Sequence, residues 1–416
     1  MQTKLALLTL SLYLIALPLY EAPKHIFAAL FILVSLGSAN NWSNSRLGVS
    51  IVTLGGSVFL AGISSEFYSV PKIFSAISPL LVCVALVCNK SVVKHYQLIL
   101  TILLLSCFIA ILESFFRWLS PGWIVEYPTL RSVGHINQSA LYVIFVMPLV
   151  LILLEMSENH NWLINMARIC FSVICVIAFF FYLFAARSVL AFAGAGLILV
   201  FALFRNPSYF LSLLSLGFAF LVIGLLVVML DVNLLNLNLS ENILKVYVEV
   251  LDKLSWRTDD GFGRLSLWNS GLTVWLENPL FGSGVGSFAS VVNSGNVLGL
   301  LEQGRTPFLD LEKLSFSSHG HSFYVTFLVE RGLVGLACAI IPLGYVINVF
   351  FKQIRRDGMQ KVDVCVYIGL ISAALVLMLG VAQTTLSLEQ GHVCVILITI
   401  GMYRQNIVSK GGGLET

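Results

Sequence analysis

The chain has 416 residues, and its 24 Lys and Arg together with its 21 Asp and Glu make up only 11% of them, less than half of the roughly 25% found in an ordinary soluble domain. Hydrophobic residues make up 58%, which supplies at most about a dozen membrane-spanning helices at roughly 20 apolar residues each. This composition excludes a water-soluble globular protein. The net charge of +3 is spread thinly, which excludes the clustered basic face of a nucleic-acid-binding protein.

Long uninterrupted apolar runs, such as residues 98–112 and 171–186, carry no charge at all. A membrane β-barrel would instead show alternating segments of about ten residues. The sequence therefore predicts an all-α polytopic membrane protein. In chain order, its twelve spans are expected at 4–20, 26–40, 47–63, 73–89, 96–117, 138–156, 162–184, 187–204, 208–230, 322–351, 363–384 and 390–404.

These spans divide the chain into four parts. Residues 1–230 are predicted to hold transmembrane helices 1–9, and residues 322–404 helices 10–12. Between them, residues 231–321 are predicted to form one long periplasmic loop with short helices, and residues 405–416 a cytoplasmic tail. This orientation follows from the positive-inside rule, because it places the densest Lys and Arg clusters, including residues 352–361, in the cytoplasm with both termini.

A few polar residues at the predicted outer face are not needed for topology. Arg187 is the only charged residue between Arg168 and Arg205, and almost no loop separates the two spans it joins. A charge so placed must face a cavity or a buried anionic partner, and a guanidinium group suits bidentate phosphate contacts. Membrane anchoring is the ordinary alternative for each outer arginine. The other candidates on this face are Arg131, Asn137, Arg264, His319 and His321.

His319 and His321 end the long loop and directly precede an apolar helix. Because imidazole has an ordinary pKa near 6.5, these residues are candidate proton carriers. Capping of the helix or contact with lipid headgroups is the alternative, and a metal site completed by Asp259 and Asp260 is a weaker one. Glu389 and His392 also fall near the outer face, where simple solvation of a helix end is expected.

Glycines 282, 284 and 286 follow Pro279 in a pattern that invites comparison with phosphate-binding loops. The Gly-Lys-Ser/Thr ending of a P-loop is missing, and so is a strand before it. A structural turn is therefore predicted here, after a helix that Pro279 ends.

Taken together, these residues resemble bacterial O-antigen ligases, within the wider group that includes O-antigen polymerases and protein O-oligosaccharyltransferases. His321-Ser322, nine residues, and then Gly332-Leu-Val-Gly335 is similar to the ligase signature of His, then Asn, Ser or Gln, nine residues, Gly, two residues, and Gly, Thr or Tyr. The resemblance covers roughly residues 130–340. It also rests on the segments Arg264-Leu-Ser-Leu-Trp268, Asn278-Pro-Leu-Phe-Gly282 and Ala186-Arg187-Ser188, and more weakly on Gly134 with Asn137.

The resemblance implies a C-type glycosyltransferase fold in the bacterial inner membrane and a role in lipopolysaccharide biosynthesis. It implies metal-independent, inverting transfer of O-antigen from undecaprenyl pyrophosphate to a sugar hydroxyl of lipid A-core at the periplasmic face, without a cofactor. Carried over by position, Arg187 and Arg264 would bind the pyrophosphate and His321 would act on the acceptor hydroxyl. His319 departs from the pattern and could share that role, while Arg131 and Asn137 are possible further substrate contacts.

Two other functions stay open. An O-antigen polymerase would use the same lipid-linked donor but extend a second lipid-linked chain. A transporter or flippase of lipid-linked sugars would have similar hydropathy, although transport normally calls for ionisable groups near the middle of the bilayer.

Overall fold

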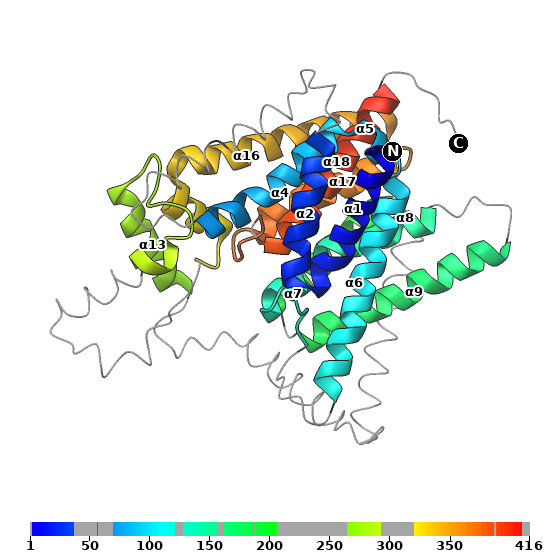
Figure 1. The fold of residues 1–416 in the computed structure, drawn as a ribbon, viewed down its shortest axis with the longest axis horizontal. Helices are drawn as coiled ribbons and strands as arrows, with labels where there is room; N and C mark the ends of the chain where they lie inside the picture. Colours follow the sequence, from blue (N-terminus) through cyan, green and yellow to red (C-terminus); the bar gives the residue numbers. More distant parts are fainter. Residues whose placement is uncertain are drawn as a thin grey trace.

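The computed structural model describes residues 2–36, 56, 70–120, 128–155, 162–186, 188–205, 264–292, 320–386 and 388–409. Within these ranges every regular element is a helix (Figure 1). Five of the described helices are long and apolar enough to cross a membrane, namely Gln2–Leu19, Tyr96–Leu119, Ile136–Leu153, Trp162–Ala185 and Phe323–Asp357. The chain is thus an all-helical protein with the composition and helix lengths of a polytopic membrane protein.

The helices begin and end within a few residues of most predicted spans. Their bounds are α1 (Gln2–Leu19), α2 (Glu21–Leu36), α4 (Val70–Cys88), α5 (Lys90–Val93), α6 (Tyr96–Leu119), α7 (Ile136–Val146), η1 (Met147–Leu149), α8 (Val150–Glu155), α9 (Trp162–Ala185), α10 (Val189–Arg205), α13 (Arg264–Glu277), α16 (Phe323–Asp357), α17 (Val364–Leu379) and α18 (Leu388–Ser409). The spans predicted at 47–63 and 208–230 lie, apart from Gly56, outside the described residues, as does most of the loop predicted at 231–321. The total of twelve spans and the long loop therefore remain predictions.

The helices pack into a central bundle around aromatic side chains. Helix α1 packs against α2 and α6, α17 against α18, and α18 against α4 and α7. Tyr13, Phe31, Tyr142 and Tyr367 are among the largest side chains that this core buries completely. Figure 1 shows α13 beside the start of α16, at one side of the bundle, and α16 packs in turn against α17 and α18.

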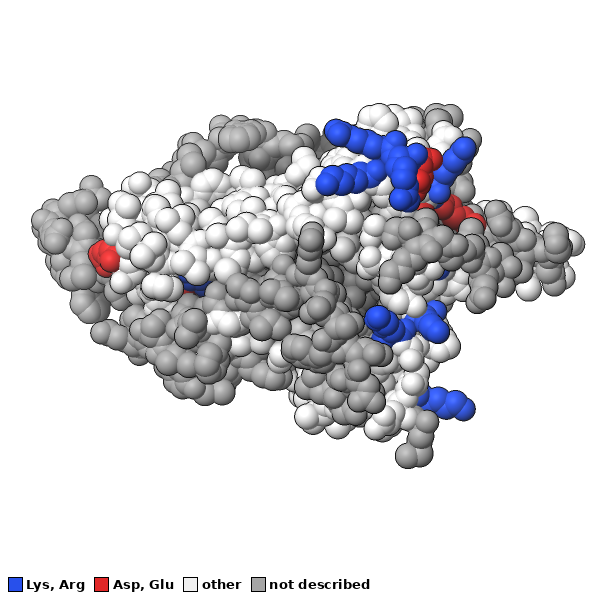
Figure 2. Space-filling view, turned by 90° about the horizontal axis from the view of Figure 1, so that it is seen from above, with Lys and Arg blue, Asp and Glu red and all other residues white. Residues whose placement is uncertain are grey.

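Basic side chains collect at helix ends rather than along the apolar surfaces. Figure 2 shows Lys and Arg gathered toward one end of the face in view. Exposed basic residues lie at the start of α1, at α5 and the turn after it, and around the end of α16: Lys4, Lys90, Lys94, Lys352, Arg355, Arg356 and Lys361. These residues belong to the clusters that the positive-inside rule assigns to the cytoplasm.

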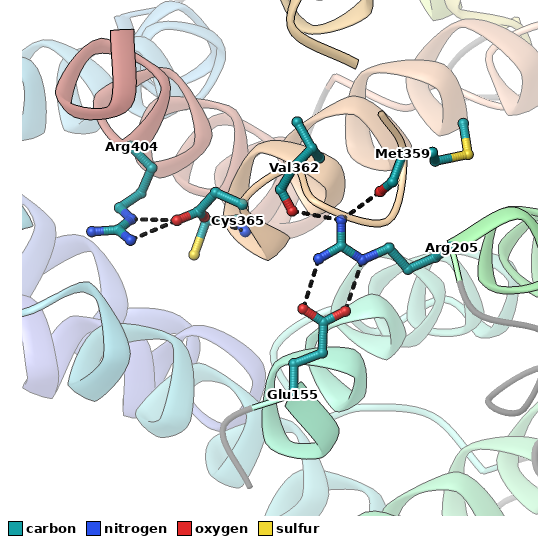
Figure 3. Close-up of polar contacts among 7 residues, drawn as sticks. Glu155, Arg205, Met359, Val362, Cys365 and Arg404 are labelled. Carbon is teal, nitrogen blue, oxygen red and sulfur yellow. Dashed lines mark hydrogen bonds and ion pairs between the residues drawn. The ribbon is translucent and has the colours of Figure 1, made fainter. Parts of the chain in front are cut away.

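A buried arginine joins three segments at this end of the bundle (Figure 3). Arg205, the last residue of α10, donates from Nε and Nη2 to the two carboxylate oxygens of Glu155, both at 2.8 Å. Its Nη1 donates to the carbonyl oxygens of Met359 at 2.7 Å and Val362 at 2.6 Å. Because each polar edge of the guanidinium group has a partner, the charge can be buried without a large desolvation cost.

Arg404 makes a second ion pair nearby. Its Nε and Nη2 donate to one carboxylate oxygen of Asp363, at 2.8 and 2.6 Å. The other carboxylate oxygen of Asp363 accepts the backbone N–H of Cys365 at 2.8 Å and caps the start of α17. The turn between α16 and α17 is therefore tied to α8, α10 and α18.

Candidate active site

A small hydrophobic core joins α13 to the start of α16. Phe288, Val292 and Val329 are completely buried, Val325 is 8% exposed, and Trp268 packs against them. Burial of these side chains holds the segment 264–292 against the helix that follows His321. The favourable free energy of such burial is roughly proportional to the apolar area removed from water. Two parts of the sequence that carry the predicted site are thereby brought together.

Gly320, the residue before His321, is held from both sides. The Nε1–H of Trp268 donates to the carbonyl oxygen of Gly320 at 2.8 Å. The backbone N–H of Gly320 donates to Oγ1 of Thr326 at 3.1 Å. A Cβ at this position would lie 2.9 Å from the ring of Phe288, closer than van der Waals contact allows, so the loop approaches the small core at a residue without a side chain.

His321 adopts a left-handed backbone conformation, with φ at +47°. This conformation is uncommon for residues other than Gly and costs free energy that the surrounding structure must supply. Hydrogen bonds of the next residue stabilise this conformation. Oγ of Ser322 accepts the N–H of Val325 at 3.4 Å and donates to the carbonyl oxygen of Gly380 at 3.3 Å. The N–H of Phe323 also donates to that carbonyl oxygen, at 2.7 Å. His321 is therefore a half-buried imidazole on a firmly held backbone.

Gly332 interrupts α16 and explains the spacing of the predicted signature. Its φ of +62° and ψ of −168° are not helical, and a Cβ there would lie 2.3 Å from the carbonyl group of Leu280. Beyond this kink, the N–H of Leu333 donates to the carbonyl oxygen of Pro279 at 2.9 Å. The N–H of Val334 donates to that of Leu280 at 3.1 Å. Only glycine can occupy this position, because any side chain would meet the turn at residues 278–282.

The turn makes the reciprocal contacts. Gly282 has a φ of +71°, and its Cβ would lie 2.5 Å from the backbone of Glu330 and Arg331. The N–H of Ser283 donates to the carbonyl oxygen of Val329 at 2.7 Å, and the N–H of Gly284 donates to that of Glu330 at 3.0 Å. The carbonyl groups freed by the kink thus find partners. The structural turn predicted for glycines 282, 284 and 286 is confirmed, and all three have positive φ.

The other predicted site residues differ in how much the structure describes. Arg264 is the first residue of α13, one turn before Trp268, so its backbone lies about 6 Å along the helix axis from that residue and on the same face. Its side chain lies outside the described residues, as do Arg187 and His319. Helix α9 ends at Ala185 and α10 begins at Val189, so the short connection predicted around Arg187 is present.

Arg131 and Asn137 flank the start of α7. Arg131 is exposed and Asn137 is half-buried. The backbone N–H of Asn137 donates to Nδ1 of His135 at 3.3 Å, which caps this helix. Ser132, next to Arg131, lines a pocket that no motif in the sequence indicates.

This polar pocket has a volume of about 150 Å³ and lies where the start of α2, the turn before α7 and the start of α18 meet α1. Lys24 forms an ion pair with Glu389, and the two side chains are 7% and 5% exposed. The same ammonium group donates to Oγ of Ser132 at 3.0 Å. The lining residues are Tyr13, Leu17, Glu21, Lys24, His25, Ala28, Ser132, Val133, Glu389 and His392.

The expectation of simple solvation for Glu389 and His392 was wrong. They are 4% and 8% exposed, because α1, α2 and α4 cover the start of α18. Nε2 of His392 lies 3.1 Å from Oγ of Ser78, and its ring makes an edge contact with that of Tyr13, with the centroids 5.8 Å apart. Lys24, the partner of Glu389, is 365 residues away in the chain, so no local pattern pairs the two.

His25 is half-buried in the first turns of α2, before the predicted span 26–40. Burial, and then the positive charge of Lys24, lower the pKa of His25 below its ordinary value. His25 is therefore neutral at pH 7 and adds a hydrogen-bonding group to the pocket without adding a charge.

The described residues contain no group of three His, Cys, Asp or Glu side chains placed to hold a metal ion. The weaker metal alternative with His319, Asp259 and Asp260 concerns residues outside the described ranges, so the structure does not test it.

Comparison with known proteins finds one family model that matches this part of the chain. The family model described as "O-Antigen ligase" matches residues 171–340, which is less than half of the chain and includes Arg187, Arg264, His319 and His321. No curated protein matches the chain. The matched region runs from α9 through α13 into α16, and thus contains the Trp268–Gly320 contact and the kink at Gly332. Residues 171–340 are thus similar to the O-antigen ligase family.

Proposed function

We propose that this protein is an O-antigen ligase of the bacterial inner membrane, with its active site at the periplasmic face. It transfers O-antigen glycan from undecaprenyl pyrophosphate to a sugar hydroxyl of lipid A-core, with inversion and without a metal ion or other cofactor. The contact between Trp268 and Gly320 is the single observation that carries this proposal. It attaches the helix that begins with Arg264 to the residue before His321, which puts a candidate base and a candidate pyrophosphate ligand on adjoining elements.

The proposed chemistry needs two groups. Attack of a sugar hydroxyl on the anomeric carbon requires a base, and neutral His321 accepts the hydroxyl proton while the new glycosidic bond forms. The bond from the anomeric carbon to the pyrophosphate oxygen breaks, and Arg264 and Arg187 stabilise the negative charge that develops there. His319, Arg131 and Asn137 are proposed as further contacts to the substrates.

Reconstituted protein tests the proposal. Wild-type protein in nanodiscs, supplied with purified lipid-linked O-antigen and lipid A-core, is expected to form a lipopolysaccharide ladder on a gel. His321→Ala and Arg264→Ala are expected to remove the ladder while the protein stays folded. His95→Ala and Arg356→Ala are matched controls, since both residues are exposed and lie outside the proposed site, His95 at the N-cap of α6 and Arg356 in the last turn of α16, and they are expected to keep it.

Other outcomes would assign another function. Elongation of the lipid-linked chain without any attachment to lipid A-core would identify a polymerase. The absence of any transfer, together with movement of the lipid-linked sugar across the bilayer, would identify a transporter. The polar pocket lies at helix ends, with Glu21 the first residue of α2 and Glu389 the second of α18, which favours chemistry at one face of the membrane over transport through its middle.

A further inference from the structure

The polar pocket at the start of α18 contains two buried polar atoms that the protein leaves without a hydrogen bond. Among the described residues, neither the hydroxyl group of Tyr13 nor Oε2 of Glu389 has a hydrogen-bond partner. Both side chains line the pocket, and the two residues are 1% and 4% exposed. Buried polar atoms normally have a hydrogen-bond partner, because burial removes their hydrogen bonds to water and an atom without a partner gains no bond in exchange. These two atoms, one a donor and one an acceptor, point to a ligand with hydroxyl groups.

The protein's own groups do not satisfy these atoms. Lys24 is already committed, since it pairs with Oε1 of Glu389 and donates to both Oγ and the carbonyl oxygen of Ser132, at 3.0 and 3.5 Å. An ammonium group has three donors, so none is left for Oε2. Tyr13 is held by its packing in the core and by the edge contact with His392. A hydroxyl group and a carboxylate oxygen therefore remain as a donor and an acceptor toward the pocket.

The charge of the pocket restricts what it can hold. Two carboxylates, from Glu21 and Glu389, face one ammonium group, from Lys24, while His25 and His392 are the other titratable groups in the lining apart from Tyr13. The carboxylates outnumber the cation, so a phosphate group would be repelled. A neutral group that can donate to Glu389 and accept from Tyr13 is favoured, and a sugar ring with several hydroxyl groups meets both requirements.

The size of the pocket is also restrictive. A volume of about 150 Å³ corresponds to about five water molecules at ~30 Å³ each. This is smaller than the pockets that enclose a whole drug-sized ligand. One sugar ring fits such a volume, and the rest of a lipid-anchored saccharide would extend outside the pocket.

The pocket is connected to the proposed active site through one short segment. Residues 380–386 lead directly into α18, whose second residue is Glu389. At the other end of this segment, the carbonyl oxygen of Gly380 accepts hydrogen bonds from Ser322 and Phe323, next to His321. Between them, the side-chain amide of Gln390 donates to the carbonyl oxygen of Thr384 at 3.1 Å. A ligand held by Glu389 is thus held by the helix that directly follows the segment supporting His321.

We propose that this pocket binds one neutral sugar ring of the acceptor lipid A-core, with Glu389 accepting from its hydroxyl groups and Tyr13 donating to them. This inference rests on the proposed function and adds a sugar-binding subsite built from α1, α2 and α18. The lining residues of this pocket do not include the arginines proposed for the pyrophosphate of the donor.

Binding of purified lipid A-core to the full-length protein in nanodiscs tests the subsite directly, with no donor present. Glu389→Gln and Tyr13→Phe are each expected to raise the Kd about tenfold, the change produced by ~1.4 kcal/mol, which lies within the range for a lost hydrogen bond. Tyr13→Phe leaves the Lys24–Glu389 pair intact, so it keeps the test valid if Glu389→Gln impairs folding. In the transfer assay, both variants are expected to raise the KM for lipid A-core and to leave the KM for the lipid-linked donor unchanged.

Two matched controls carry the same chemical changes elsewhere. Glu113→Gln alters a carboxylate paired with Arg117 on α6, and Tyr367→Phe removes a hydroxyl group that donates to Phe201 on α10. Both are expected to bind lipid A-core as the wild type does. An unchanged Kd for both pocket variants would mean that the pocket holds only water and would overturn the inference, and so would a weaker affinity for the donor alone.

The two levels of the proposal can fail separately. If the wild type forms the lipopolysaccharide ladder and both pocket variants bind lipid A-core normally, the subsite is wrong and the ligase proposal stands. If the wild type neither transfers glycan nor binds lipid A-core, the proposed function fails and the subsite fails with it.

Discussion

The indole N–H of Trp268 donates to the carbonyl oxygen of Gly320 at 2.8 Å, across 52 residues of sequence. This bond links α13, a described helix of the predicted long loop, to the residue before His321. The backbone of the proposed base is consequently positioned by an element that also begins with a proposed phosphate ligand, Arg264.

Trp268→Phe removes this hydrogen bond and keeps most of the apolar contact. A single bond of this kind contributes about 1 kcal/mol to the free energy of unfolding, so the variant is expected to stay folded. Transfer of glycan is expected to fall at least tenfold, because small displacements of a catalytic group are costly. Rates measured with saturating donor and acceptor check this.

Trp275→Phe is the matched control for Trp268→Phe. Its indole N–H also donates from α13, but to the carbonyl oxygen of Pro279 at 3.0 Å and not to that of Gly320. An equal loss of activity in the two variants would mean that the effect arises from α13 as a whole and would contradict the specific role of Trp268.

Two substitutions of His321 separate its strained backbone from its chemistry. His321→Gly and His321→Ala both remove the imidazole and are expected to abolish transfer. The Gly variant is expected to be more stable than the Ala variant by about 1 kcal/mol, because only Gly adopts a positive φ without a steric penalty. Thermal unfolding of both variants in detergent measures the difference, and equal stability would show that the φ of +47° is not a source of strain.

Gly332→Ala tests the docking of the kink in α16. Its backbone conformation is one that side chains rarely adopt, and a Cβ would lie 2.3 Å from Leu280. The conformation alone costs about 1–3 kcal/mol, and the clash adds to it, so a large fall in Tm or a loss of folded protein is expected.

Gly358→Ala isolates the conformational part of this effect. Gly358 has a φ of +80° and a ψ of 148°, and nothing lies within 4 Å of the position of its Cβ. The Gly358→Ala variant is expected to lower the free energy of unfolding only by the cost of this backbone conformation, about 1–3 kcal/mol. If the two substitutions lower Tm equally, contact between the kink and the turn at residues 278–282 is not important for stability.

Arg205→Met tests the buried ion pair at the other end of the bundle. Arg205 is 6% exposed, and its loss leaves Glu155 and two carbonyl oxygens without their donor. Removing one partner of a buried pair costs about 3–5 kcal/mol, and thermal unfolding is expected to show it. Arg356→Met removes an exposed pair with Asp357, and no measurable change in Tm is expected because solvent screens that pair. A small effect of Arg205→Met would mean that Glu155 is solvated in the folded protein.

The class of the protein and most of its helix positions could be predicted because both depend on local composition. A run of about 20 apolar residues is long enough to form a membrane-spanning helix, and the turn after Pro279 follows from the closely spaced glycines 282, 284 and 286, which favour turns. Arg264, Trp268 and His321 could be singled out for the same kind of reason, since their spacing matches a family pattern.

What the sequence by itself determined about this protein is thus its apolar, helical character, which is that of a polytopic membrane protein, and a short set of candidate residues. Only the tertiary structure decided that Lys24 pairs with Glu389, that Glu389 and His392 are buried, and that Gly332 docks against Leu280. The physical reason is distance along the chain. Hydropathy and helical spacing report on residues within a few turns of one another, whereas these contacts join residues that lie from about 50 to more than 300 positions apart in the chain.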